Sequence, residues 1–182
     1  MKTPWMEMSV REFQSALASS SPTPGGGTAA AISLGQAAAL TIMVCDLTIG
    51  KEKWKSGWDI ANKALPICVK IMSRAGVLAD LDSDAFDDVM AAYRMPKGDE
   101  KEIIIRKESI QKSSIVATEI PFETSKLALE ILEILPELAL KGNGNAVSDV
   151  GVAGLLASAA CKGALFNAVS YTHLTLPTMI RV

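Results

Sequence analysis

Histidine is almost absent from this sequence. His173 is the only one among 182 residues, and the three cysteines, Cys45, Cys68 and Cys161, lie far apart. Catalytic triads, Cys–His pairs and zinc sites depend on these two residue types, so the composition argues against all three. Scattered cysteines inside apolar segments are typical of small buried residues in a reducing compartment. We therefore expect a cytoplasmic protein without a metal site.

Basic blocks and an N-terminal apolar leader are also missing. The net charge is −2 and aromatic residues make up 5% of the chain, which argues against a nucleic-acid partner. The segment 29–49 is long enough to cross a bilayer. Its many alanines, together with Gln36 and Asp46, favour a buried helix of a soluble protein instead. We expect neither a signal peptide nor a membrane span.

Helical periodicity dominates what is present, and no alternating strand pattern precedes Ser170. Ser9 and Glu12 have the spacing of a capping box at a helix start. Predicted helices cover residues 10–18, 29–49, 54–95, 100–118, 121–141 and a last one from Ser148 or Asp149 to 169. The predicted fold class is all-α, a bundle of long antiparallel helices, with one domain at residues 1–169.

The tail of residues 170–182 departs from this pattern. It is rich in threonine, prone to β structure, and carries Pro177 shortly after a strong helix. Two interpretations stay open: a native extension, or a sequencing artefact that resembles translated adaptor sequence, which we favour. His173 carries no chemistry on either interpretation.

Two glycine- and asparagine-rich junctions introduce the most apolar helices. The first contains Gly25, Gly26 and Gly27, and the second runs from Gly142 to Asn145. Free backbone N–H groups at a helix start bind anionic or carbonyl-bearing ligands. Simpler roles exist as well, because asparagines form turns, Ser148 can cap a helix, and Asp149 in a first turn suits the helix dipole.

An acidic cluster begins at residue 80. Four of its carboxylates share one predicted helix face, which we interpret as solvated: Asp80, Asp84, Asp87 and Asp88. Asp82 differs, because it lies on the apolar stripe with Phe86 and Val89. A carboxylate there needs a partner or a ligand, and a raised pKa would suit it to general acid–base catalysis.

Four ordered blocks resemble the C-terminal family of formiminotransferase-cyclodeaminase. The blocks are Pro24–Thr28 with Leu47–Lys51, Asp80–Asp87 with Met95–Lys97, Gly142–Asn145 with Ser148–Ala153, and Gly163–Asn167. The family includes formimidoyltetrahydrofolate cyclodeaminases and methenyltetrahydrofolate cyclohydrolases. The resemblance covers about residues 5–169, and the chain departs from the family pattern at Val169.

The resemblance implies an all-helical homodimer that holds a tetrahydrofolate derivative as substrate near the subunit contact, with no tightly bound cofactor. It makes Asp82 and Asp149 candidates for proton transfer. It also implies substrate-binding roles for two groups of residues. The glycines Gly25, Gly26 and Gly27 would approach the pterin, and Lys51, Lys53, Lys97, Asn143 and Asn145 would bind other parts of the folate, the lysines its glutamate carboxylates.

We predict a methenyltetrahydrofolate cyclohydrolase, which hydrolyses 5,10-methenyltetrahydrofolate to 10-formyltetrahydrofolate. A formimidoyltetrahydrofolate cyclodeaminase, which closes the ring and releases ammonia, is one alternative. A non-catalytic helical dimerisation or ligand-binding module is another. The enzyme interpretation expects Asp82, Asp149 and the Gly25–Gly27 segment to face one cleft, within one subunit or across a dimer.

Overall fold

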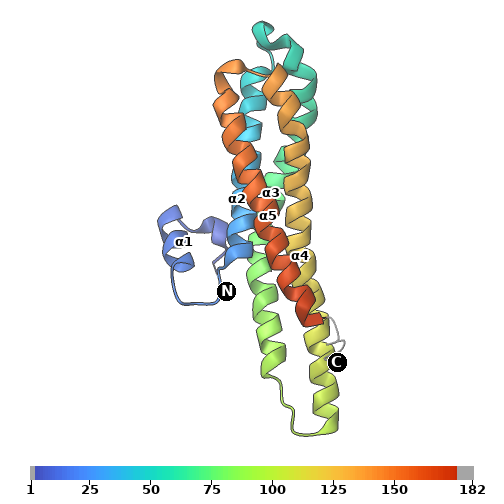
Figure 1. Cartoon of the computed structure of the whole chain (residues 1–182). Helices are drawn as coiled ribbons and strands as arrows, with labels where there is room; N and C mark the ends of the chain where they lie inside the picture. The colour runs from blue at the N-terminus through green and yellow to red at the C-terminus, as the bar shows by residue number, and fades with distance from the viewer. Residues whose placement is uncertain (1–2, 176–182) are drawn as a thin grey trace.

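The computed structural model describes the backbone of residues 3–175 and the side chains up to residue 171. Every regular element in this range is a helix: η1 (Trp5–Glu7), α1 (Val10–Leu17), α2 (Gly26–Thr48), η2 (Glu52–Gly57), α3 (Trp58–Arg94), α4 (Glu100–Lys141), η3 (Gly144–Ala146) and α5 (Val147–Thr175). The long helices α2 to α5 run alternately up and down, and the α3–α4 hairpin extends beyond the end of α5 (Figure 1). The predicted all-α antiparallel bundle is confirmed.

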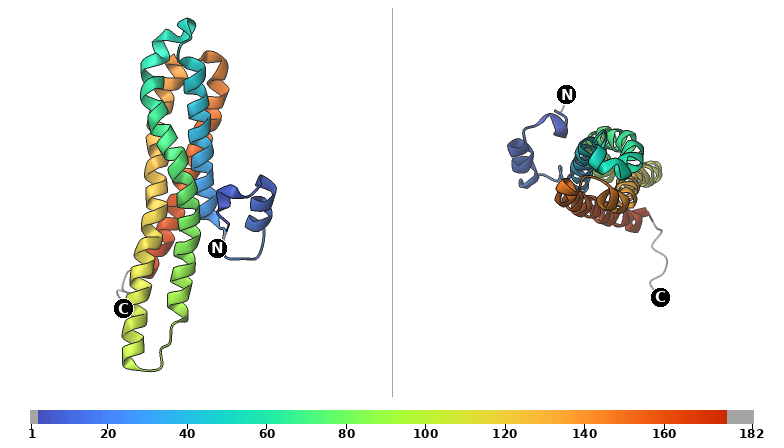
Figure 2. Two further views of the ribbon diagram at one scale, coloured as in Figure 1. Left: turned by 180° about the vertical axis from the view of Figure 1, so that it is seen from behind. Right: turned by 90° about the horizontal axis from the view of Figure 1, so that it is seen from above.

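The four long helices form a closed ring, because α2 packs on α3, α3 on α4, α4 on α5, and α5 again on α2 (Figure 2). Alanines supply most of the core, and only a few large side chains such as Leu34, Leu78 and Ile131 are fully buried among them. Small side chains let the helix axes approach closely. At Gly35, an added β-carbon would lie 3.4 Å from the Ala75 β-carbon, so α2 and α3 meet there almost backbone to backbone.

The N-terminal segment lies beside the bundle rather than in it (Figure 1). The predicted capping box is confirmed, since Ser9 Oγ accepts from the Glu12 N–H and the Glu12 carboxylate accepts from the Ser9 N–H. Trp5 attaches the segment to the bundle. Its side chain is buried and packs edge-on against the Phe13 ring, with the two ring centres 6.2 Å apart.

Helix α4 corrects the predicted boundary between residues 118 and 121. One helix continues through Pro121 and Pro136 to Lys141. A proline inside a helix costs about 3 kcal/mol, because it removes one hydrogen bond and crowds the preceding turn. Packing of α4 against both α3 and α5 outweighs that local preference.

Both junction helices also differ from their predicted bounds. Helix α2 begins at Gly26, so two of the three glycines lie in its first turn rather than before it. Helix α5 begins at Val147, which places Ser148 inside the helix instead of at the N-cap. Its backbone stays helical to Thr175, beyond the predicted end at 169, while the side chain of His173 and residues 176–182 lie outside the described part.

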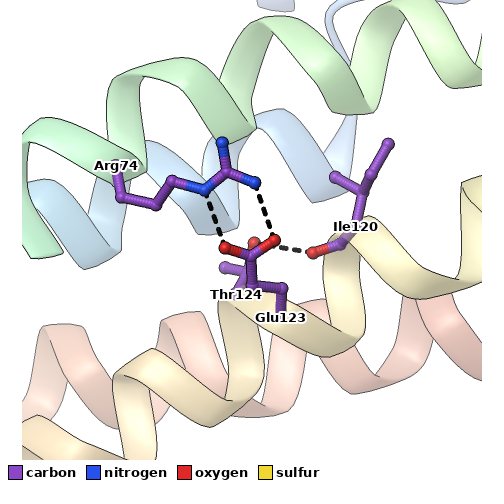
Figure 3. A network of polar contacts seen from close by, with 4 residues as sticks. All are labelled: Arg74, Ile120, Glu123 and Thr124. Carbon is purple, nitrogen blue, oxygen red and sulfur yellow. Dashed lines mark hydrogen bonds and ion pairs between the residues drawn. The ribbon is translucent and has the colours of Figure 1, made fainter.

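An ion pair joins α3 to α4 near the middle of the bundle. The Arg74 guanidinium donates two hydrogen bonds to the Glu123 carboxylate, at 2.7 and 2.8 Å (Figure 3). Beside it, Thr124 Oγ1 donates to the Ile120 carbonyl within α4. Each partner stabilises the charged form of the other. The pKa of Arg74 is therefore raised and that of Glu123 is lowered, chiefly by their mutual hydrogen bonds.

Helix α5 leaves an apolar stripe uncovered in the single chain. Val152, Leu155, Phe166 and Val169 are 47 to 74% exposed, and their spacing puts them on one face of the helix. By length and composition both α2 and the segment Gly144–Tyr171 could span a bilayer. The bundle buries 56% of the most apolar stretch of α2 but only 28% of that in the α5 segment.

Gly57 tests the close packing where η2 meets the end of α4. A β-carbon added there would collide with the backbone of Lys141 and Gly142. We expect Gly57→Ala to lower the free energy of unfolding by about 1–3 kcal/mol, as overpacking does. Gly151→Ala is the matched control, because a β-carbon there meets nothing within 4 Å and the added helix propensity should stabilise by about 0.5–1 kcal/mol. Equal effects in chemical denaturation would contradict this packing.

Candidate active site

A cavity of about 340 Å³ opens where the start of α2 meets the middle of α3 and the end of α5. Helix α2 contributes Gly26 and Gly27, preceded by Gly25, Pro22 and Thr23; α3 contributes Asp82 and Phe86; and α5 contributes Asn167, Ser170 and Tyr171. Two predicted site features, Asp82 and the Gly25–Gly27 segment, thus share one cavity, although they are more than fifty residues apart in sequence.

Asp82 has the partner that its place on the apolar stripe predicted. Thr28 Oγ1 donates to Asp82 Oδ2 at 3.0 Å, and the carboxyl group is half-buried. Burial raises the pKa of Asp82 above its ordinary value, while hydrogen bonds from the Thr28 side chain and backbone oppose that rise. A carboxyl group with a raised pKa beside a cavity can both accept and return a proton.

The glycine at position 27 sets how closely Asp82 approaches α2. A β-carbon on Gly27 would overlap the Asp82 carboxyl group, so α3 can bring this side chain against the first turn only because position 27 has none. The N-cap residue Gly25 offers no side-chain cap to α2. The Asp82 carboxylate therefore supplies negative charge at the positive end of α2, from a neighbouring helix.

A chain of buried hydroxyl groups continues behind Asp82. Thr28 Oγ1 lies 3.0 Å from Ser83 Oγ, and Trp5 Nε1 donates to Ser83 Oγ at 3.0 Å. Sequence analysis assigned none of these three residues to the site. Thr28 ends the first motif block and Ser83 lies beside Asp82 in the Asp80–Asp87 block, which are signals, whereas Trp5 lies in none of the four blocks.

The remaining acidic residues separate from Asp82 largely as predicted. Asp84, Asp87 and Asp88 are exposed on α3. The prediction of a solvated position is wrong for Asp80. Its Oδ1 accepts a hydrogen bond from the Trp5 backbone N–H at 2.9 Å, and the residue is half-buried under the N-terminal segment. The sequence could not show this contact, since the segment that covers Asp80 lies 75 residues away.

Most of the other predicted substrate-binding residues gather at the opposite end of the bundle. Asn143 Nδ2 donates to the Leu47 carbonyl, its N–H donates to Thr48 Oγ1, and its Oδ1 accepts from the Asn145 N–H. Lys51, at the start of η2, and Lys53, inside it, are exposed nearby. The Lys53 amine lies 4.8 Å from the centre of the Trp54 ring. Asp149 lies in the first turn of α5 at this same end.

Within one chain, the predicted residues therefore do not face one cleft. Thr28 touches Asp82 and Thr48 touches Asn143, and the twenty residues of α2 between them span about 30 Å. Lys97 belongs to neither group, because it lies exposed in the loop that joins α3 to α4. The single-subunit form of the one-cleft prediction is wrong, and the form across a dimer stays a prediction.

The cavity also contains residues that the sequence analysis left without a site role. Phe86 and Tyr171 supply aromatic rings, and Asn167 supplies an amide whose Nδ2 donates to the Gly163 carbonyl. Burial and the charge of Asp82 raise the pKa of Tyr171 to about 12, so its hydroxyl stays neutral at physiological pH. Asn167 lay inside a quoted motif, whereas Tyr171 belongs to the predicted atypical tail.

The buried cysteines behave as unreactive core residues. Burial raises the pKa of the Cys45 thiol to about 12 and that of Cys68 to about 11, which keeps both protonated at neutral pH. Among the described residues, no group of three His, Cys, Asp or Glu side chains is placed to hold a metal ion. Asp82 contributes the carboxyl group to the lining of this cavity.

Comparison with known proteins identifies the family of this chain. The model of the formiminotransferase-cyclodeaminase family matches residues 9–170. The chain belongs to the formiminotransferase-cyclodeaminase family. The family prediction made from the four motif blocks is therefore confirmed.

Individual relatives carry two different enzyme names. A methenyltetrahydrofolate cyclohydrolase from Methylorubrum extorquens is 41% identical over 159 residues, which are 87% of this chain and 76% of that protein. A formimidoyltransferase-cyclodeaminase from Dictyostelium discoideum is 35% identical over 82% of this chain, which spans only 27% of that protein. The crystal structure of a formiminotetrahydrofolate cyclodeaminase from Thermotoga maritima superposes with a TM-score of 0.81 at 25% identity, covering 93% of this chain and 80% of the other.

Gly27 provides a structural test of the Asp82 contact. We expect Gly27→Ala to lower the free energy of unfolding by about 1–3 kcal/mol, because the new methyl group displaces a carboxyl group held between two helices. Gly26→Ala is the control, since its β-carbon would lie at an ordinary 3.5 Å from Asn167 Nδ2. Thermal and urea unfolding of both variants measure the difference, and a Gly27→Ala protein as stable as Gly26→Ala would refute the contact.

Proposed function

We propose that this protein is a methenyltetrahydrofolate cyclohydrolase. The observation that carries the proposal is the half-buried Asp82, with a raised pKa, in a cavity formed by the first turn of α2. The relative with the same activity in its name is 41% identical over 87% of the chain, which supports this choice. The substrate is a tetrahydrofolate derivative, and we propose that no tightly bound cofactor takes part and that the enzyme works in the cytoplasm.

The proposed reaction is the addition of water to the methenyl carbon between N5 and N10. The Asp82 carboxylate removes a proton from the attacking water as the new C–O bond forms, giving a tetrahedral carbon. The C–N5 bond then breaks, and N5 receives from Asp82 the proton that the carboxylate removed from water. The remaining hydroxyl group loses its proton to solvent as the formyl C=O forms on N10, so one proton is released overall.

The cavity suits a flat heterocycle as the group to be bound. Phe86 and Tyr171 provide aromatic surfaces, and the Gly25–Gly27 segment lets a ligand approach the backbone without meeting side chains. Asn167 adds an amide whose Oδ1 is an acceptor for a ring N–H or amino group. We propose that the pterin ring occupies this space with its methenyl carbon beside Asp82.

Asp82→Asn tests the catalytic assignment. The amide keeps the shape of the carboxyl group but accepts no proton, so we expect kcat to fall by about 10²–10⁴-fold, the usual contribution of a general acid–base group. The measurement is the loss of methenyl absorbance, with the rate in the absence of enzyme subtracted. Asp88→Asn removes an exposed carboxylate from the same helix and should leave kcat unchanged. Full turnover by Asp82→Asn would end the assignment.

A formimidoyltetrahydrofolate cyclodeaminase is the second candidate, favoured by the name of the Thermotoga maritima structure. That reaction has N10 attack the formimidoyl carbon and expels ammonia. N10 loses one proton, which Asp82 would pass to the departing nitrogen, and that nitrogen takes a second proton from solvent before it leaves as ammonia. Parallel assays of ammonia release and of methenyl absorbance on one preparation distinguish the two activities. We expect the cyclohydrolase rate to exceed the cyclodeaminase rate.

We also propose that the protein acts as a homodimer in which two copies pack along α5. The stripe of Val152, Leu155, Phe166 and Val169, which has the exposed Lys162 on the same face, supplies a largely apolar surface of the kind that twofold dimers bury. If the two copies of α5 run antiparallel, the Asp149 and Asn143 end of one subunit comes near the Asp82 end of the other. Lys51, Lys53 and Asn145 would then bind the folate across the contact.

Leu155→Glu tests the dimer. A charge in the middle of the α5 stripe should shift the protein from dimer to monomer in sedimentation equilibrium, with loss of at least tenfold in kcat/KM if the partner completes the site. Leu140→Glu is the control, because Leu140 is 82% exposed on α4, outside the stripe. A Leu155→Glu protein with unchanged mass would refute the interface.

A further inference from the structure

Asp82 is held from behind by residues that do not line the cavity. Thr28, Ser83 and Trp5 form a hydrogen-bonded chain whose three links, Trp5 to Ser83, Ser83 to Thr28, and Thr28 to Asp82, each measure 3.0 Å. The side chains of Thr28 and Ser83 are fully buried, and Trp5 is 6% exposed. The chain is therefore shielded from bulk water.

The direction of each hydrogen bond follows from the chemistry of the groups. The Trp5 indole N–H only donates, so Ser83 Oγ accepts from it. An ionised Asp82 only accepts, so the single Thr28 hydroxyl proton is committed to Oδ2. Ser83 must then donate its own proton to Thr28. All three donors thus point toward the carboxylate, and each bond strengthens the next.

The chain ties the N-terminal segment to the cavity. Trp5 also donates its backbone N–H to Asp80, two residues before Asp82 on the same helix. Trp5 precedes residue 9, where the match to the family model begins.

We propose that Thr28 is a positioning residue for Asp82, and that Ser83 and Trp5 hold Thr28 in the orientation that does so. This inference rests on the proposed role of Asp82 in proton transfer. Thr28 fixes one carboxyl oxygen, selects the rotamer of the side chain, and favours the ionised form that removes a proton from water. Its branched side chain at a helix start leaves little freedom for another orientation.

Few other groups can titrate near Asp82. Tyr171 of α5 lines the same cavity, but its pKa of about 12 keeps it neutral over the working range. The first turn of α2 carries no acidic side chain, and on α3 the neighbouring carboxylates are Asp80, bound to Trp5, and the exposed Asp84. In a pH profile of kcat/KM, the acidic limb is the range in which the rate rises as the catalytic base ionises. This limb therefore reports the ionisation of Asp82, and Asp82→Asn should abolish it.

The test is the pH profile of Thr28→Val, assayed with 5,10-methenyltetrahydrofolate. Valine has nearly the same volume and lacks the hydroxyl group, so the pKa of Asp82 should rise further and the limb should move to higher pH. We expect kcat at neutral pH to fall about tenfold, a typical effect of removing a hydrogen bond to a charged group, with KM changed less than twofold. Thr28→Ser restores the hydroxyl group and should restore the limb.

Thr41→Val is the matched control. Thr41 is also fully buried on α2, and its hydroxyl group donates only to the Ala37 carbonyl, thirteen residues from Thr28. It should leave the limb in place even where it lowers the melting temperature. Trp5→Phe tests the remote end of the chain and does not require a change at Thr28. It removes the indole N–H, keeps an aromatic ring, and should move the limb in the same direction by a smaller amount.

The outcomes separate this inference from the proposed function. If Asp82→Asn keeps full turnover, the proposed function fails. If Asp82→Asn is inactive while Thr28→Val and Trp5→Phe both keep the wild-type limb, the positioning role is overturned, whether or not their rates fall. A limb that moves in Thr28→Val, returns in Thr28→Ser and stays in Thr41→Val establishes it.

Discussion

The carboxyl group of Asp82, from α3, lies against the first turn of α2. It occupies a space that a β-carbon at position 27 would fill. Gly27 leaves that space open, and Asp82 enters it to bind Thr28. The start of α2 has free N–H groups and no side-chain cap of its own. Negative charge from a neighbouring helix therefore stabilises it. The cavity, the pKa of Asp82 and the orientation of its oxygens all depend on this contact.

The alanine-rich core is what makes such an approach possible along the whole bundle. Fully buried alanines on α2, α3, α4 and α5 let the four axes come close, as at the Gly35–Ala75 contact. Close packing then keeps Asp82 partly out of water and raises its pKa. The group thus opposes stability at neutral pH, because its protonated form is favoured in the folded chain and the resulting stabilisation is lost as pH rises through the raised pKa.

The arrangement separates two chemical roles by the length of one helix. The proposed proton-transfer group, Asp82, lies at the start of α2, whereas the exposed lysines and the Asn143 turn lie at its end, about 30 Å away. A folate molecule has a reactive ring system at one end and carboxylates at the other. A twofold dimer along α5 is the simplest way for one ligand to meet both kinds of residue, and it gives the exposed stripe of α5 an occupant.

Local sequence patterns determined the helical class, the capping box at Ser9, the uncommon place of Asp82 on an apolar stripe, and the family, because each follows from spacing along one chain. They could not determine that α4 continues through Pro121, that Asp80 lies under Trp5, or that Asn143 and Asp82 lie at opposite ends. Those facts depend on contacts between residues 50 to 100 positions apart. The Trp5–Ser83–Thr28 chain is the clearest case: three ordinary side chains carry no common motif, and only the packing of the N-terminal segment against α2 and α3 brings their polar atoms within 3.0 Å of one another.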